Sequence, residues 1–142
     1  MRIWVAYKFR EEDPAEVRER LTELKNVLAK AGHQQVTMFE DIQNWKEIEM
    51  PMVQVVQEGY ELMKTCDAGL CLFAKGDSPS EGRGWEAGYL VGLGKPTIMA
   101  VHKSLNRSEF NELLYCENPA NKANGTCSVI EYENLSNIAE AL

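Results

Sequence analysis

Glu86 is the residue of this chain whose type and position point most directly to chemistry. It follows a loop over residues 75–83 and lies near the start of a helix that we expect from Gly84 to about Leu93. Glycine lets a backbone approach a ligand closely, and the free N–H groups of a helix N-terminus favour an anion. Ordinary loops have a similar composition, so the loop alone leaves a phosphate-binding role open. Its glycine and serine residues are Gly76, Ser78, Ser80 and Gly82.

The chemistry that suits Glu86 is that of an ionised carboxylate. In the first turn of a helix, the helix dipole favours the charged form, so we expect Glu86 to be ionised. At the mouth of a pocket, such a group can attack or stabilise a sugar carbon that loses its leaving group, as in retaining glycosidases. Acidic residues are also frequent in first helical turns because they favour the dipole. Position alone therefore favours this second, purely structural interpretation.

Strands and helices are expected to alternate along the whole chain of 142 residues. Strands are predicted from short apolar runs, and helices from apolar residues that recur every three or four positions. This order is typical of an α/β fold. We expect a single domain over residues 1–142, with three α/β/α layers around a mainly parallel five-stranded sheet of the flavodoxin or Rossmann type. The expected strands are residues 2–7, 35–39, 68–74, 97–101 and 127–132, and the expected helices are residues 14–31, 51–64, 84–93, part of 103–115, and 135–142.

In a fold of this kind, ligands bind beyond the carboxyl ends of the strands. Three loops leave those ends, over residues 7–13, 40–47 and 75–83. The third loop leads directly to Glu86, which places this carboxylate at the edge of the sheet where a ligand is expected.

Composition argues against several classes of partner and cofactor. The formal net charge of −7 is unsuited to a nucleic acid, and no apolar run is long enough to span a membrane. We expect no metal and no cofactor, because no two cysteines have C-x-x-C spacing and neither histidine is near them in sequence. Reduced cysteines in the core of a cytoplasmic protein are the favoured interpretation of Cys66, Cys71, Cys116 and Cys127.

A longer pattern around Glu86 resembles a known family. The segment 66–73 reads C-D-A-G-L-C-L-F, and the segment 80–96 reads S-E-G-R-G-W-E-A-G-Y-L-V-G-L-G-K-P. Together they resemble the nucleoside 2-deoxyribosyltransferase superfamily, which includes the deoxynucleoside 5′-monophosphate N-glycosidases. In that family an Asp precedes a buried strand, and a loop then leads to G-x-E-x-G-x-A-x-x-x-G-K-P and the next strand. The closest match covers about a quarter of the chain.

The resemblance implies roles for individual residues. Glu86 matches the family's nucleophile, which forms a covalent deoxyribosyl-enzyme, and Tyr7 lies where first-strand loop residues reach the active site. Ser80 falls where the members that cleave monophosphates have a phosphate-binding serine, which favours a 5′-phosphate substrate. The residues that we expect to bind the substrate are Lys8, Arg10, Asp41, Ser78, Ser80, Gly82, Arg83 and Gly84, with Lys8, Arg10 and Arg83 as cationic partners of a phosphate.

One position departs from the family pattern. The family usually has an Asp about two helical turns before the position of Asp67, where it assists the leaving base, and this chain has Gly59 there. Glu58 can take the place of this Asp if the helix is rotated. Asp41 or Asp77 can do so if its loop reaches into the site. Without any of them the general acid is missing.

The resemblance implies an enzyme that cleaves the N-glycosidic bond of a (deoxy)nucleoside or its 5′-monophosphate, by hydrolysis or base exchange. Two alternatives stay open. The missing acid suits a nucleotide-binding module without turnover, and the segment 5–13, V-A-Y-K-F-R-E-E-D, looks like the opening of TIR domains, which cleave NAD or act as scaffolds. Family members often complete their sites across a subunit interface, so we expect a homodimer or a higher homo-oligomer.

Overall fold

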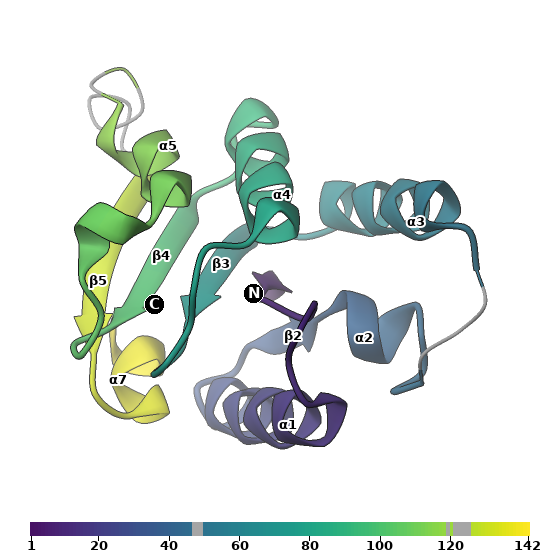
Figure 1. Cartoon of the computed structure of the whole chain (residues 1–142), viewed down its shortest axis with the longest axis horizontal. Helices are drawn as coiled ribbons and strands as arrows, with labels where there is room; N and C mark the ends of the chain where they lie inside the picture. The colour runs from purple at the N-terminus through teal and green to yellow at the C-terminus, as the bar shows by residue number, and fades with distance from the viewer. Residues whose placement is uncertain (47–49, 119, 121–125) are drawn as a thin grey trace.

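The protein folds around a five-stranded, all-parallel sheet whose strand order is β2-β1-β3-β4-β5. The computed structural model describes residues 1–46, 50–118, 120 and 126–142 (Figure 1). The strands are β1 (Arg2–Ala6), β2 (Gln34–Val36), β3 (Ala68–Phe73), β4 (Thr97–His102) and β5 (Cys127–Tyr132). The helices are α1 (Pro14–Lys30), α2 (Met38–Asp41), α3 (Met52–Lys64), α4 (Glu81–Gly92), α5 (Leu114–Glu117) and α7 (Leu135–Glu140), with the 3₁₀ turns η1 (Arg107–Glu109) and η2 (Asn111–Leu113) before α5.

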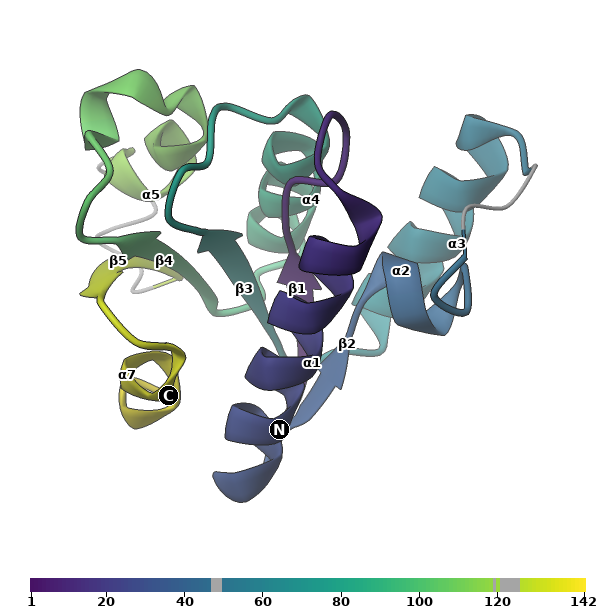
Figure 2. The same ribbon diagram turned by 60° about the horizontal axis from the view of Figure 1, so that its bottom comes forward.

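Helices cover both faces of the sheet, as the alternation of elements predicts. In Figures 1 and 2, α3, α4 and α5 lie on one face, and α1 and α7 lie on the other. Each face has its own buried cluster: Trp4, Met63 and Leu90 belong to the first, whereas Ile3, Leu24 and Ile138 belong to the second. The expected three-layer α/β/α architecture is therefore confirmed.

The central strand β3 is buried along its whole length, which explains its continuous apolar sequence. Helix α4 packs closely on this strand at Gly69. A Cβ atom added at Gly69 would lie 2.5 Å from Leu90 Cδ1, so the strand needs a bare backbone at this point. This contact sets how near α4, and the residues at its start, come to the sheet.

Helix α4 begins three residues earlier than predicted, at Glu81 in place of Gly84. Ser80 is its N-cap, and the Ser80 hydroxyl oxygen accepts a bond from the Arg83 N–H at 3.5 Å. The prediction missed this cap because it assigned the residues up to Arg83, including Gly82, to the loop. Serine is among the preferred N-cap residues, and the correction moves Glu86 from the first to the second helical turn.

The second strand ends earlier than predicted, at Val36, and a short helix occupies the end of the expected strand. Thr37 caps α2, because its side chain accepts a bond from the Glu40 N–H at 3.1 Å. The Asp41 carboxylate in turn accepts the Thr37 N–H at 2.7 Å. This reciprocal cap turns the chain away from the sheet.

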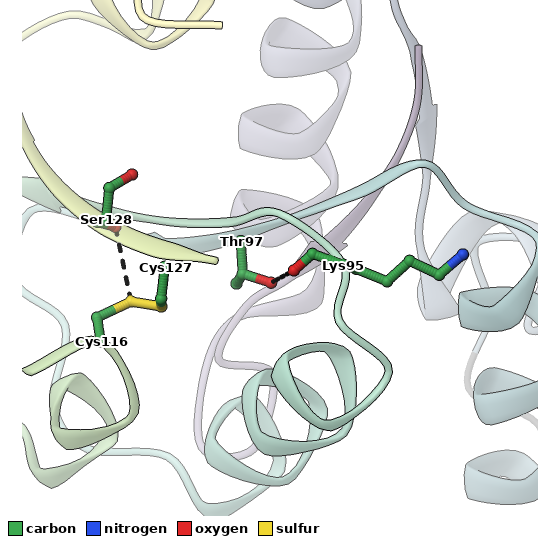
Figure 3. Close-up of a disulfide and its surroundings, with 5 residues drawn as sticks. All are labelled: Lys95, Thr97, Cys116, Cys127 and Ser128. Carbon is green, nitrogen blue, oxygen red and sulfur yellow. Dashed lines mark hydrogen bonds between the residues drawn. A yellow bond between two sulfur atoms is a disulfide. The ribbon is translucent and has the colours of Figure 1, made fainter. Parts of the chain in front are cut away.

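Cys116 and Cys127 form a disulfide that joins α5 to the start of β5 (Figure 3). The prediction of four reduced cysteines is therefore wrong for this pair, whereas Cys66 and Cys71 are buried free thiols. The two bonded residues are 11 positions apart in sequence, and α5 packs on β5 so that their Cα atoms lie 4.8 Å apart. Only the folded packing brings them within the distance that a disulfide requires.

Of the helices in the described part of the chain, none combines the length and the apolar character that crossing a membrane requires.

Candidate active site

A pocket of about 380 Å³ lies beyond the carboxyl ends of β1 and β3. It is formed by four segments that are distant in sequence: the loop after β1, the region of α2, one face of α3, and the loop that leads into α4. Its lining includes seven of the predicted site residues, which are Tyr7, Lys8, Arg10, Ser78, Ser80, Gly82 and Glu86.

Glu86 lies in the wall of this pocket and is partly buried. Burial raises the pKa of its carboxyl from 4.5 to about 8, and the nearby Trp4 indole and Arg83 guanidinium offset this rise only in part. The expectation that the helix dipole keeps Glu86 ionised is therefore wrong for the free protein at neutral pH. The main reason is desolvation by burial, which the helix dipole does not offset because its effect falls off within the first turn and Glu86 lies in the second.

Tyr7 lies beside Glu86 at the end of β1. Its hydroxyl oxygen accepts a bond from the Phe39 N–H at 2.9 Å, which fixes the position of the phenol. Burial and the negative charge of Glu86 raise the pKa of this phenol well above its usual range. Tyr7 therefore stays protonated, and its O–H group remains a hydrogen-bond donor.

One rim of the pocket is polar and contains a cation. The ammonium group of Lys8 donates a hydrogen bond to the Ser78 hydroxyl, which brings the loops after β1 and β3 side by side (Figure 2). Ser80 and Gly82 line the same rim, and the space where a Gly82 side chain would extend is open. This rim has the hydroxyl groups, the charge and the exposed backbone that an anionic group requires.

Arg83 does not line the pocket, although it was expected to contact a phosphate. Its side chain is fully buried beneath the loop and forms ion pairs with Asp77 at 2.8 Å and Glu112 at 3.0 Å. Gly84 is also buried, and a Cβ atom there would lie 3.4 Å from Glu112 Cγ. Both residues therefore lie behind the surface that a ligand would meet.

Glu58 and Asp41 also lie outside the pocket. Both side chains are exposed and line a shallow groove beside α3 instead. The Asp41 carboxylate is bound to the Thr37 N–H. For Glu58 to act as an acid, or for Asp41 to bind the substrate, α3 or α2 would have to rearrange. Both roles stay predictions.

Gly59, the position where the family pattern has an Asp, is buried in α3. A Cβ atom added there would lie 2.8 Å from Met38 Cε and 3.7 Å from Trp4 Cη2. The Met38 methyl group therefore occupies the space of the expected acid, and the pocket is apolar at that point.

The rest of the pocket wall is mainly apolar, and its residues were not among those predicted to form the site. The ring of Tyr60 stacks on that of Tyr89 with their centroids 4.2 Å apart. The helical periodicity of α3 predicted a buried face, but it gave no sign that this face borders a cavity. Flat apolar surfaces suit a nucleobase, and among the described residues Gln43 contributes an amide side chain to the wall. The apolar lining consists of Phe9, Met38, Met52, Val55, Val56, Tyr60, Pro79 and Trp85.

Within the described ranges 1–46, 50–118, 120 and 126–142, no group of three or more His, Cys, Asp or Glu side chains is arranged to hold a metal ion.

The sequence over residues 6–131 matches the family model described as nucleoside 2-deoxyribosyltransferase. The chain belongs to this family. Its members are enzymes that act on nucleosides or nucleotides, and the family resemblance around Glu86 is thereby confirmed. No curated protein sequence matches the chain.

Solved structures of the same fold cover nearly the whole chain. The CMP N-glycosidase BcmB of Clostridium botulinum is 16% identical with a TM-score of 0.64, and the match covers 99% of this chain and 96% of that one. The 2-deoxyribosyltransferase of Bacillus psychrosaccharolyticus is 19% identical with a TM-score of 0.64, covering 98% and 90%. A conserved protein of Enterococcus faecalis V583 is 13% identical with a TM-score of 0.59, covering 98% and 94%. At these identities the likeness supports the fold alone.

Proposed function

We propose that this enzyme cleaves the N-glycosidic bond of a (deoxy)nucleoside 5′-monophosphate or the corresponding nucleoside, with Glu86 as the nucleophile. The observation that carries the proposal is the arrangement of one pocket. Glu86 lies in its wall together with Lys8 and Ser80 on a polar rim and the stacked Tyr60 on an apolar side. A sugar held over Glu86 would have its phosphate on the rim and its base against the apolar side.

In the proposed reaction, a carboxylate oxygen of Glu86 forms a bond to the anomeric carbon while the bond from that carbon to the base nitrogen breaks. The bonding electrons leave with the base, which takes a proton from solvent or already carries one. Water then cleaves the glycosyl ester, or a second base nitrogen accepts the sugar. Only the ionised carboxylate attacks, so the proton on Glu86 must leave first. Tyr7 stays neutral beside this carboxylate, so its O–H is available as a donor at the reacting centre.

A 5′-phosphate is the substrate group that the polar rim favours. Lys8 supplies the charge, Ser78 and Ser80 supply hydroxyl groups, and Gly82 leaves the backbone accessible. Arg10 also borders the pocket and is the second cation available to a phosphate. A monophosphate should therefore bind more tightly than its nucleoside.

A panel of nucleosides and 5′-monophosphates, scored for free base by chromatography, tests the activity. Base release by the wild type and its loss in Glu86→Gln support the nucleophile, whereas equal turnover by the variant rejects it. Addition of a second base separates the hydrolase from the transferase. NAD belongs in the same panel, because nicotinamide release without base release from the other substrates favours the TIR-like alternative.

The closed space at Gly59 favours the second candidate, a module that binds a nucleotide without turnover. The wall that would need a general acid is filled by the Met38 methyl group, and Glu58 faces away from the pocket. Thermal stabilisation by a monophosphate, with no free base formed over hours, is the result that this candidate predicts.

We also infer that a second copy of the chain covers the pocket mouth. Met52 and Trp85 line this pocket and yet are 62% and 54% exposed, and the adjoining Val53 is 78% exposed. Such an apolar cluster suits a homodimer or a higher homo-oligomer. Light scattering after gel filtration measures the mass.

We also propose a cytoplasmic location. Disulfides are rare in that compartment, so this proposal requires that the bond between Cys116 and Cys127 forms only under oxidation.

A further inference from the structure

A buried ion network lies directly beneath the loop that forms the polar rim. Arg83 is its centre and has no exposed surface. Asp77 lies in the loop itself, whereas Glu112 belongs to η2, 29 residues further along the chain. Neither carboxylate lines the pocket, so neither contacts a substrate in the proposed reaction.

The Arg83 guanidinium binds the loop at several points. Nη1 donates to the Leu72 carbonyl at 3.1 Å and to Asp77 at 2.8 Å. Nη2 donates to the Ser78 carbonyl at 3.1 Å. The guanidinium also lies 3.8 Å from the centroid of the Phe73 ring. Arg83 therefore joins the end of β3 to the loop, with a planar cationic fork of donors that lysine cannot replace.

Glu112 extends this network to the start of α4. One of its carboxylate oxygens, Oε1, accepts both the Arg83 Nη2–H at 3.0 Å and the Ser80 backbone N–H at 2.6 Å. Asp77 makes the equivalent bond at the other end of the loop, where it accepts the Ala74 N–H at 2.9 Å. The backbone is therefore held by a carboxylate at both ends of the loop that carries Ser78.

This arrangement also decides which donors a ligand can use. Glu112 adds a negative charge to that of Glu81 at the N-terminus of α4, and the Ser80 N–H is occupied. The Ser80 hydroxyl oxygen accepts the Arg83 N–H, which leaves the hydroxyl hydrogen available to donate. A phosphate on the rim must therefore use side-chain hydroxyl groups and Lys8, whose positions depend on the loop conformation.

We propose that Glu112 and Asp77 act through Arg83 as positioning residues that hold the loop over residues 75–80 in the shape that accepts the 5′-phosphate. The assignment of the phosphate rests on the proposed function, whereas the ordering of the loop does not. Removal of one partner leaves a buried charge without compensation, so the loop should rearrange.

Glu112→Gln is the test, with Glu109→Gln as the matched control. Glu109 is an exposed glutamate in the neighbouring turn η1 and has no bond to the loop. With a 5′-monophosphate as substrate, we expect Glu112→Gln to raise KM about tenfold with little change in kcat. The KM for the corresponding nucleoside should stay within about twofold, because that substrate has no group on the rim. An equal rise for both substrates, or no rise, overturns the proposal.

A second variant and a second measurement keep the test independent of folding and of the reaction. Arg83→Lys retains the charge but loses the fork that binds the loop and Glu112 together, so it should give the same selective rise in KM. Amide hydrogen exchange over residues 75–83 should become faster in Glu112→Gln than in the wild type and in Glu109→Gln. Unchanged exchange rejects the network. Faster exchange in a protein that cleaves no substrate keeps the network and rejects the proposed function.

Discussion

Glu86 combines two properties that oppose each other. The carboxylate must be ionised to attack a sugar, yet burial raises its pKa to about 8. Arg83 and Trp4 favour the charged form without restoring the ordinary value. A partly desolvated carboxylate is a stronger nucleophile than a hydrated one. Burial therefore lowers the fraction of Glu86 that is ionised near neutral pH, but it makes the ionised form more reactive.

The pH dependence of catalysis follows from this pKa. Below pH 8 most Glu86 in the free enzyme is protonated and cannot attack, so kcat/KM should rise with pH and level off above about 8. The measurement is kcat/KM for base release between pH 5 and pH 10, with a substrate whose concentration can be raised to saturation. The Glu109→Gln control should keep the wild-type profile. A profile that is already flat from pH 5 upward would show that the carboxylate is ionised throughout.

Gly59 allows a direct test of the missing acid. We expect Gly59→Asp in a Met38→Ala background to raise kcat above that of Met38→Ala, by about tenfold or more, because a carboxyl in an apolar wall has a raised pKa and can protonate the leaving base. The Met38→Ala change is needed because Met38 Cε lies 2.8 Å from the added Cβ. The matched control is Gly59→Asn in the same background. Equal rates for Asp and Asn would show that proton donation does not limit turnover.

At the scale of elements, predictions from sequence succeed where one local signal decides the outcome. The buried run of β3 is predicted to within a residue, because a short run that is apolar throughout is typical of a strand covered on both faces. The start of α4 is wrong by three residues, because the glycines at 82 and 84 conceal the Ser80 cap. The position of Glu86 within the helix, in the second turn, depends on that cap.

The disulfide between α5 and β5 should stabilise the element that carries Glu112. It closes a loop of 11 residues in sequence, which corresponds to about 3 kcal/mol in a chain-entropy model. Thermal melts with and without dithiothreitol test this, and we expect the Tm of the wild type to be lower with the reductant. The double variant Cys116→Ser/Cys127→Ser should have the Tm of the reduced wild type in both conditions. The control Cys66→Ser should lose stability on reduction as the wild type does. The same Tm with and without reductant would show that the two cysteines are not bonded in solution.

At the scale of the whole molecule, the pocket depends on contacts that no local pattern contains. Its apolar wall comes from α2, α3 and α4, and its polar rim comes from two separate loops. Glu112 binds the Ser80 N–H across 32 residues, and neither its sequence neighbours nor its spacing indicates this role. The family pattern around Glu86 could be predicted, because it lies within one strand–loop–helix unit. The buried position of Arg83 could not, because an arginine beside a glycine-rich loop is typical of a surface cation.

The proton on Glu86 also links the site to the stability of the fold. In the unfolded chain the carboxyl ionises near pH 4.5, whereas in the folded protein it keeps its proton up to about pH 8. Between these values the folded state binds one more proton, so the free energy of unfolding falls as pH rises through this window. Glu86→Gln removes this dependence, since an amide does not titrate. We expect the variant to gain about 1–3 kcal/mol over the wild type at pH 8 and little at pH 4.5.

Urea unfolding at pH 4.5, 6 and 8 measures this gain, and Glu109→Gln should follow the wild type at each pH. Tyr7 and Cys71 do not interfere, because burial moves their pKa values well above this window. A Glu86→Gln variant that is less stable than the wild type at pH 8 would show that the carboxylate is stabilised where it lies. A gain that grows with pH would mean that the fold is less stable because it keeps a reactive carboxyl in its pocket.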